Sequence, residues 1–349
     1  MSIDTSALSR QAFLRYAGIG AGSLALGAST GIVPAFAAAE SKPAVKLKVG
    51  WAGGTCEAAT YAGVHAGHFA KEGIDVELVR LANSQAGIDA LGSGKVDAIG
   101  GVLYQYLKPI EQGIDVKLTA GLHGGCLRLI AGKNSGVKTL QDVKGKTVAV
   151  DAIGGGSMSF FSALLIGEGL DPVKDVTWRA YPRDQFGIVL ERGEAQVVAA
   201  GDPFGYFVIQ EGKGVQIADN MVGGVYYADK EISHHHFCCY AVIRGGLVRE
   251  DPKTVAALTR GWINASRWVG KHIDETARIE IDNKYNATSI ATVSALLSSY
   301  EYHPSADGIL EELEIAAKDF KAANVLDPHT DPKELAQRAY IDIFKAAAS

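Results

Sequence analysis

The stretch Lys71-Glu72-Gly73-Ile74-Asp75-Val76-Glu77-Leu78 decides the fold class, because it leads from the end of a helix directly into a strand. Before it, the spacing of apolar residues in 61–72 predicts a helix that Gly73 ends, and residues 76–81 predict a strand. Residues 45–51 predict an earlier strand. Helical connections between strands imply right-handed crossovers and a parallel sheet. We therefore predict an α/β fold.

The alternation of strands and helices then continues and restarts after Gly132. The first part predicts further helices at 84–91 and 104–111 and strands at 96–99 and 116–121. The second part predicts strands at 147–151, 176–180, 197–200 and 215–218 and helices at 157–168, 185–191 and 204–210. After Gly246 the pattern predicts only amphipathic helices.

Two α/β lobes follow from this restart and from the length of 349 residues. We predict that lobe one comprises residues 45–125 and 240–349, including a C-terminal helical extension that wraps it. Lobe two is expected to comprise residues 126–239.

The composition excludes two classes of protein. With 47% hydrophobic and 21% charged residues, the chain can bury a large core and is not a disordered or fibrous protein. The net charge is −5, and the Lys and Arg residues are scattered along the chain. A nucleic-acid partner is therefore not expected.

Residues 1–37 have the order of a cleavable export signal. Arg10 and Arg15 precede an uncharged, mostly apolar run at 16–35, and small residues around Ala37 provide a cleavage site. The length and glycine content of the run argue against a permanent membrane span. Gln11 stands where a twin-arginine signal carries its second arginine, so the export route stays open. The sequence predicts a periplasmic protein cleaved near Ala37.

The stretch 71–78 resembles a signature of the nitrate/sulfonate/taurine-type substrate-binding proteins of ABC transporters, and residues 91–98 and 169–172 resemble two further landmarks. The resemblance extends from about Val45 to Ile243. It implies a two-lobed type II periplasmic binding protein, in which two crossing segments join the lobes and a ligand binds in the cleft between them. It also implies a solute carrier rather than an enzyme, with a small-molecule solute and an ABC transporter permease in the inner membrane as partners.

The segment SHHHFCCY at residues 233–240 places three imidazoles and two thiols in a predicted strand. These soft donors favour Zn, Cu, Fe or Ni over hard cations. Strand alternation would put His234, His236 and Cys238 on one face and Cys239 on the other, so that only about half of the cluster faces one site.

If the two crossing segments run side by side, as the resemblance implies, His123 and Cys126 lie near this strand. Cys56 follows the first strand, where open α/β sheets place ligand contacts. We therefore predict a site for a soft metal or a thiophilic solute, with these metal ligands: His123, Cys126, His234, His236 and Cys238. Two alternatives stay open. One is a disulfide that joins Cys126 to Cys238 or Cys239, and the other is a set of structural Cys and His side chains around an organic ligand.

A glycine-rich run predicts an anion-binding site. Gly154, Gly155 and Gly156 follow a strand, and Ser157 is expected to cap the next helix, whose N-terminal N–H groups would face the anion. The alternative is a flexible turn. Asp202 falls where the resemblance implies an acidic residue facing the cleft. Four arginines, which are more often surface residues, could add positive charge: Arg128, Arg179, Arg183 and Arg192.

The predicted ligand-binding set thus adds Cys56, His123 and Cys126 to the glycine run and Asp202.

A second resemblance gives an alternative function. The residues HHHFC at 234–238 are similar to the Cys-Cys-Cys-Phe-Cys stretch of the fungal hydroxymethylpyrimidine phosphate synthases, which are enzymes on the same fold with iron implicated at that stretch. An iron-dependent enzyme of this kind is the alternative, although His replaces three of the cysteines. Our main expectation is a binding protein for a small anionic, metal-bearing or thiophilic solute.

Overall fold

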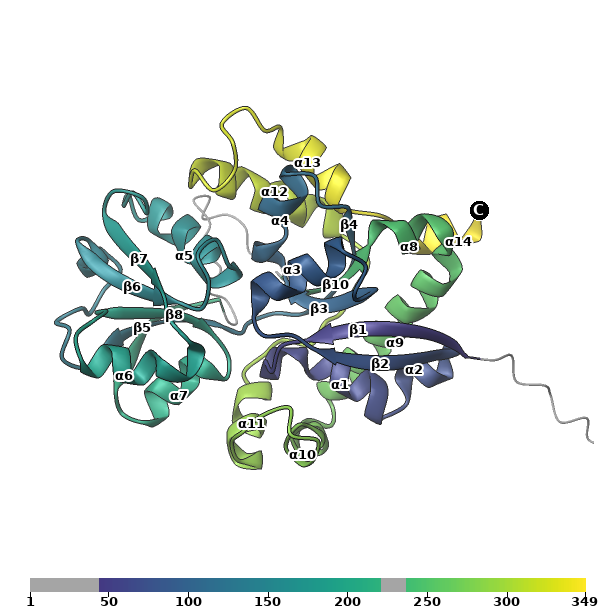
Figure 1. Ribbon diagram of the computed structural model, residues 1–349, viewed down its shortest axis with the longest axis horizontal. Coiled ribbons are helices and arrows are strands. Elements are labelled where there is room, and N and C mark those ends of the chain that lie inside the picture. Colours follow the sequence, from purple (N-terminus) through teal and green to yellow (C-terminus); the bar gives the residue numbers. More distant parts are fainter. Residues whose placement is uncertain (1–43, 221–236) are drawn as a thin grey trace, which may run out of the picture. The chain divides into compact units, whose positions relative to one another are not determined.

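The computed structural model describes residues 44–220 and 237–349, which are organised around two five-stranded sheets (Figure 1). The first sheet has the order β2 (Ile74–Arg80), β1 (Val45–Trp51), β3 (Ala98–Val102), β10 (Cys239–Arg244) and β4 (Val116–His123). The second has the order β7 (Val176–Ala180), β6 (Lys146–Val150), β8 (Val197–Gly201), β5 (Leu127–Gly132) and β9 (Gly214–Asp219). We call the parts built on these sheets lobe one and lobe two. The predicted α/β class is confirmed.

Both sheets are mixed, whereas the sequence predicted parallel ones. β1 pairs in parallel with β2 and β3, but β10 lies antiparallel between β3 and β4, and β5 lies antiparallel between β8 and β9. Parallel neighbours need a long crossover connection. β5 instead follows β4 through residues 124–126 and enters the second sheet from the other lobe, so its direction is reversed. No strand was predicted at β5, because its residues were assigned to the segment that crosses between the lobes.

Local patterns predicted several elements closely, including β1, β7 and the helix α7 (Phe204–Gln210). The helix predicted at 61–72 is broken into α1 (Ala58–His65) and α2 (His68–Lys71). Gly67 separates the two helices with a φ of 74°, a left-handed conformation that glycine adopts without strain.

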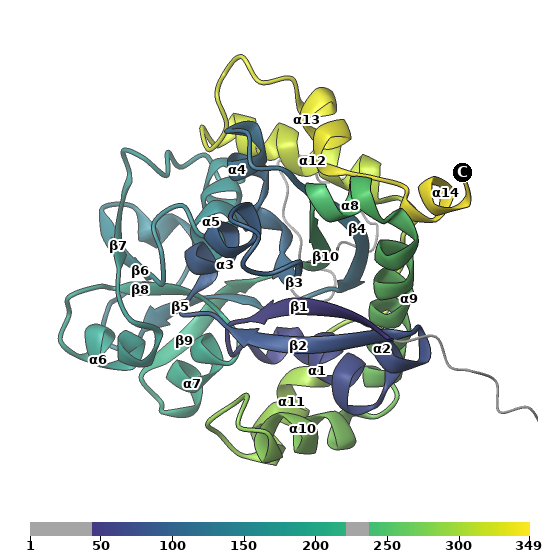
Figure 2. The ribbon, with the colours of Figure 1, turned by 45° about the vertical axis from the view of Figure 1, so that its right-hand side comes forward.

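Helices cover both faces of the first sheet, as Figure 2 shows. On β10, Ala241 and Ile243 pack in a core with α1, α2, α9 (Pro252–Val269) and α14 (Ile343–Ala348). Val242 points to the opposite core, which includes residues of α3 (Ser84–Gly92), α4 (Leu107–Glu111), α12 (Ile309–Ala322) and α13 (Pro332–Ala339). This alternation buries β10 on both faces.

In lobe two, α5 (Gly156–Gly167) covers one face of the sheet, and α6 (Phe186–Glu191) and α7 cover the other. The predicted C-terminal helices are present and begin with α8 (Gly245–Glu250). Pro252 and Pro332 occupy the first turns of α9 and α13, where a missing N–H costs nothing, and Asp251 caps α9 through the Thr254 N–H. The remaining helices are α10 (Ile273–Asp282) and α11 (Ile290–Leu297). The residues at which lobe one gives way to lobe two stay a prediction.

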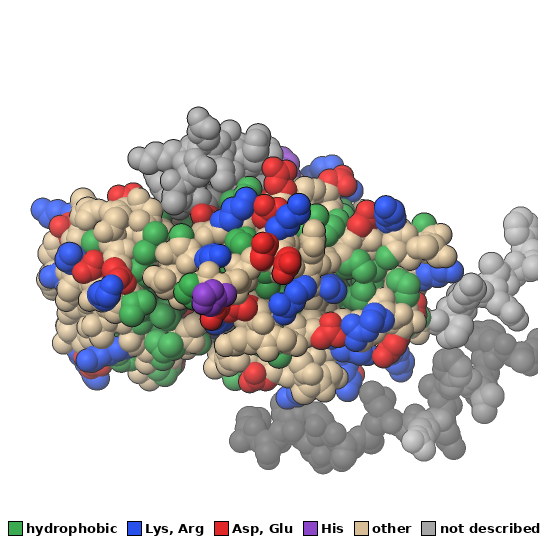
Figure 3. All heavy atoms as spheres, turned by 90° about the horizontal axis from the view of Figure 1, so that it is seen from above, with side chains coloured by type: hydrophobic (Ala, Val, Ile, Leu, Met, Phe, Trp, Pro, Cys, Tyr) green, Lys and Arg blue, Asp and Glu red, His purple; other side chains and the backbone are tan. Residues whose placement is uncertain are grey.

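The surface carries charges of both signs. Acidic and basic side chains are interspersed over the face of the described residues seen in Figure 3. Within residues 44–220 and 237–349, no helix combines the length and the apolar character that crossing a membrane requires.

Candidate functional site

The two segments that cross between the sheets lie side by side. The Cys238 N–H donates a hydrogen bond of 2.8 Å to the His123 carbonyl, and Cys239 pairs with His123 where β10 meets β4. Cys126 lies between β4 and β5 and has a φ of 130°, which is rare for a residue other than glycine. Asp202 fixes this link by donating its N–H to the Cys126 carbonyl at 2.9 Å.

A cavity of about 90 Å³ lies where the carboxyl ends of strands from both sheets meet, which is where open α/β sheets bind ligands. Lobe one lines it with residues that follow β1, β2 and β3, and lobe two with residues that follow β6, β7 and β8. It is large enough to hold ordered water or a small solute. A wider hollow of about 870 Å³ shares Ala52, Asn83 and Arg183 with it.

The helix α5 begins at this cavity. Gly155 is its N-cap and makes no side-chain capping bond, while Gly156 and Ser157 line the cavity. Ser157 does not cap the helix as the sequence predicted, because the helix starts one residue earlier and places Ser157 inside the first turn. Gly156 lies close to lobe one, since a Cβ there would be 3.2 Å from Val102 Cγ1. N–H groups of a first helical turn lack intrahelical partners and attract negative charge.

Arg183 brings a positive charge from lobe two into the cavity. Its Nη2 donates to Asp151 Oδ2 at 2.7 Å and its Nε at 3.1 Å, and both side chains are largely buried. Its Nη1 reaches the Ala52 carbonyl of lobe one at 3.4 Å, and its guanidinium lies 5.2 Å from the Phe204 ring centre. Arg183 thus contacts both lobes at the cavity wall.

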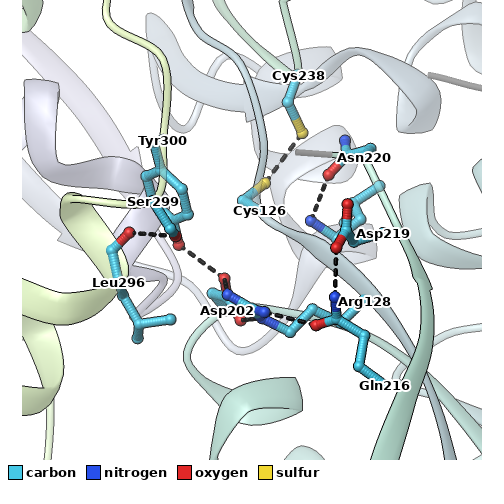
Figure 4. Close-up of polar contacts among 11 residues, drawn as sticks. Cys126, Arg128, Asp202, Gln216, Asp219, Asn220, Cys238, Leu296, Ser299 and Tyr300 are labelled. Atoms are coloured by element: carbon cyan, nitrogen blue, oxygen red, sulfur yellow. Dashed lines mark hydrogen bonds and ion pairs between the residues drawn. The ribbon is translucent and has the colours of Figure 1, made fainter. Parts of the chain in front are cut away.

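A buried ion pair holds Asp202 beneath the cavity (Figure 4). Arg128 donates from Nε to Asp202 Oδ1 at 2.7 Å and from Nη2 to Oδ2 at 3.0 Å, and Tyr300 donates to Oδ2 at 3.0 Å. The Asp202 side chain is fully buried, and burial raises its pKa to about 6 against the opposing effect of Arg128. Both carboxylate oxygens already have partners, so Asp202 orders the site rather than offering a free ligand. The sequence suggested that Arg128 lies on the surface, but the structure buries it.

Glu57 is a buried carboxylate in the turn after β1. Its oxygens accept from the Ala52 N–H at 2.8 Å, the Gly54 N–H at 2.7 Å and the Tyr61 hydroxyl at 2.9 Å. Burial, reinforced by the neighbouring Cys56, raises the pKa of Glu57 to about 7. The side chain therefore shapes the turn that carries Cys56 into the cavity wall, and its charge changes near neutral pH.

We predict that Glu57 lowers the stability of the protein as the pH rises. Its pKa is higher in the folded state than in the unfolded chain, so the folded state binds the proton more tightly and loses this advantage between pH 4.5 and 7. The difference between the folded and unfolded pKa values of Glu57 corresponds to about 3 kcal/mol of folding free energy. Urea unfolding at pH 5 and pH 7.5 should show a smaller fall in stability for Glu57→Gln than for the wild type. An equal fall in both proteins would contradict this account.

All four cysteines of the chain converge beside this turn. The Sγ atoms of Cys56, Cys126 and Cys239 lie within 4.8 Å of one another, and the Sγ of Cys238 is 3.0 Å from that of Cys126. All four are free thiols. A hydrogen bond from Cys126 and a second from Cys239 lower the pKa of Cys56 well below its usual value.

The predicted separation of Cys238 and Cys239 onto opposite faces is wrong. The strand begins only at Cys239, and its register against β4 shifts after this residue, so alternation does not extend to Cys238. Both thiols therefore contact Cys126. Figure 4 shows the Cys126 and Cys238 sulfurs facing each other.

His123 is buried next to the cysteines, and both of its ring nitrogens face carbonyl oxygens. Nε2 is 2.8 Å from the Cys56 carbonyl and Nδ1 is 3.2 Å from the Gly124 carbonyl. Its ring stacks on Tyr300 at a centroid distance of 5.2 Å. To bind a metal, His123 would have to give up one of these carbonyl contacts.

The structure brings together much of the predicted site. Four of the predicted ligand-binding residues line the cavity: Cys56, Gly156, Ser157 and Asp202. His123 and Cys126 are buried next to it, and Gly154 and Gly155 precede α5. The predicted metal ligands His234 and His236 lie outside the described residues. Sequence reasoning missed Glu57 and Tyr300, because a single Glu or Tyr carries no local signal of burial.

Solved structures with the same arrangement are similar to the chain at low sequence identity. The ligand-binding component of an ABC-type import system from Staphylococcus aureus, with zinc bound, has a TM-score of 0.69 at 15% identity over 87% of this chain and 99% of its own. The periplasmic nitrate-binding protein NrtA from Synechocystis PCC 6803 has a TM-score of 0.69 at 17% identity over 87% and 88%. The alkanesulfonate-binding protein SsuA from Xanthomonas axonopodis pv. citri, bound to MOPS, has a TM-score of 0.67 at 15% identity over 84% and 98%.

These likenesses show that the chain has the periplasmic binding protein fold, which agrees with the resemblance of residues 71–78 to nitrate- and sulfonate-type binding proteins. No curated protein matches the sequence. The sequence model of the NMT1-like family matches residues 40–281, more than half of the chain. The chain therefore belongs to the NMT1-like family.

Proposed function

We propose that this protein is the periplasmic solute-binding component of an ABC importer and that it captures a small anionic solute between its lobes. The family and the structurally similar nitrate- and sulfonate-binding proteins support this class of function. The export signal expected in residues 1–37 would deliver it to the periplasm, where it would pass its solute to a membrane permease. In this role the protein carries a solute and catalyses no reaction.

The start of α5 beside Arg183 is the observation that carries the choice of an anion. Gly156 and Ser157 of the first turn line the cavity together with Arg183, and the N–H groups of a first turn lack intrahelical partners. Asp151 pairs with Arg183, and Asp202 pairs with Arg128. The remaining carboxylate, Glu57, has a pKa of about 7 and is about half protonated at neutral pH. A compact anion such as a sulfonate headgroup would accept hydrogen bonds from the first-turn N–H groups and from the Arg183 guanidinium.

A thermal-unfolding panel tests the proposal. The mature protein is heated with nitrate, sulfate, ethanesulfonate or taurine, and with chloride at equal ionic strength as the control. We expect at least one anion to stabilise the protein relative to chloride, by about 2.7 kcal/mol at a concentration 100 times its Kd. If none of the four differs from chloride at millimolar concentration, an anionic solute of this class is ruled out.

A further inference from the structure

Three of the clustered thiols come from separate parts of lobe one and the crossing segments. Cys56 belongs to the turn after β1, Cys126 to the link between β4 and β5, and Cys239 to the first position of β10. Cys126 and Cys239 are almost fully buried, whereas Cys56 is half-buried and lines the cavity. A solute or ion that enters the cavity therefore meets Cys56 first.

The surrounding backbone holds Cys126 in place. Its φ of 130° is unfavourable for a residue with a side chain, at a cost of about 1–3 kcal/mol, and persists only where the surroundings impose it. Asn220 accepts the N–H of the next residue, Leu127, at 2.7 Å, and Asp202 donates to the Cys126 carbonyl. Strained positions of this kind cluster at functional sites. The backbone at Cys126 is thus held in place by hydrogen bonds from both sides of the link.

Aromatic side chains pack around His123, which contacts the Cys56 carbonyl. The His123 ring packs against those of Tyr300 and Tyr302, at centroid distances of 5.2 Å and 5.9 Å, and the two tyrosine rings lie 6.5 Å apart. The Tyr302 hydroxyl is buried and has no hydrogen-bond partner among the described residues, although it interacts electrostatically with Cys56, Cys239 and Cys126. A buried hydroxyl without a partner is costly. Tyr302 therefore adds a buried polar group beside His123.

We propose that Cys56, Cys126 and Cys239 bind one soft metal ion through three thiolate sulfurs. Metal–sulfur bonds of about 2.3 Å would place the sulfurs of a three-coordinate ion about 4 Å apart, which the thiols already approach, since they lie within 4.8 Å of one another. Thiolates select Cu(I) and Zn(II) over hard cations. Each thiol releases its proton to solvent as its metal–sulfur bond forms, and no group is oxidised or reduced.

This ligand set differs from the one predicted from the sequence, of which His234 and His236 lie outside the described residues. Cys56 and Cys239 become ligands, whereas Cys238, whose sulfur approaches that of Cys126 at 3.0 Å but lies outside the group of three, does not. The site lies beside the solute cavity, but metal binding there needs no anion. Its test can therefore succeed or fail whatever the outcome for the proposed function.

A competition titration tests the site. The exported protein is reduced, kept free of oxygen and titrated with Cu(I) against the chelator bicinchoninate, and with Zn(II) in a second series. We expect one ion per chain, and we expect Cys56→Ser and Cys239→Ser each to weaken binding by at least about 100-fold. Cys238→Ser is the comparison variant: it also removes a buried thiol but keeps a hydroxyl that can donate to the Cys126 sulfur, so it should weaken binding less than Cys239→Ser does. Circular dichroism confirms that each variant is folded.

Alkylation of the wild-type protein provides a readout without a substitution. Bound Cu(I) or Zn(II) should protect Cys56 from iodoacetamide, which peptide mass spectrometry measures. Three outcomes would each overturn the proposal: no metal bound by four free thiols, equal losses in Cys238→Ser and Cys239→Ser, or exported protein whose Cys126 and Cys238 form a disulfide and which binds no metal.

Discussion

Replacing Arg128 by Met is expected to lower the free energy of unfolding by about 3–5 kcal/mol. Arg128 makes two hydrogen bonds to Asp202, whose side chain is fully buried, so the substitution leaves a carboxylate without its counter-charge in the interior. Among the side chains that the structure describes, the Tyr300 hydroxyl would remain to donate to it. Urea unfolding at pH 7.5 measures the loss.

The pH dependence of this loss identifies its cause. Burial already raises the pKa of Asp202 to about 6, and removal of Arg128 would raise it further. The folded variant would then hold the proton more tightly than the unfolded chain, so its stability would fall as the pH rises. The deficit should be larger at pH 8 than at pH 5, and Asp202→Asn should restore much of the stability of the Arg128→Met variant.

Lys174→Met is the control for the loss of one positive charge. Lys174 pairs with Asp171 at 2.9 Å, but the two side chains are 83% and 30% exposed. Exposed pairs contribute less than about 1 kcal/mol. An Arg128→Met variant that loses no more stability than Lys174→Met, at either pH, would show that the Arg128–Asp202 pair does not stabilise the folded protein.

Replacing Arg183 by Met is expected to weaken binding of the anionic solute by at least about 100-fold, or about 3 kcal/mol. The substitution removes the cavity guanidinium that offsets the charge of Asp151, so an attraction for the anion is lost and the Asp151 carboxylate repels it more strongly. Arg183 also contacts both lobes, because it donates to the Ala52 carbonyl. Isothermal titration with the anion that stabilises the wild type most gives the change in Kd.

Arg192→Met is the matched control for this binding experiment. Arg192 also belongs to lobe two, but its side chain is 69% exposed and its distance to Glu194 is 3.7 Å. The control should bind the anion as the wild type does. Retention of wild-type affinity by Arg183→Met would place the anion elsewhere in the molecule, and equal losses in both variants would indicate an effect of net charge alone.

The sequence predicted the fold class because helices and strands have local patterns. β1, β7 and α7 match their predicted ranges, since their apolar spacing and flanking turn residues are contained within each segment. The direction of β5 and β10 could not be predicted in the same way. The direction of these strands depends on the lobe from which the chain enters the sheet. The residues next to each strand do not indicate which lobe that is.

The candidate site was predictable only where residue type alone is informative. Cysteines are rare and the glycine run is distinctive, so Cys56, Cys126 and Gly156 were found. The partners of Asp202 lie 74 and 98 residues away in sequence at Arg128 and Tyr300, and nothing local marks either pairing. The choice between Cys238 and Cys239 depended on the residue at which a strand begins, which periodicity does not determine within one or two positions.

Hydrogen exchange measured by mass spectrometry, with and without the best-binding anion of the panel, tests the central claim most directly. A solute held between the lobes should slow exchange in peptides from both sheets. The peptides to follow contain the cavity residues Gly54 and Gly101 of lobe one and Ser157 and Asp202 of lobe two. Slower exchange in both sets is the result that we predict. Protection confined to one lobe, or to residues away from the cavity, would contradict the proposal that the solute binds in the cleft between them.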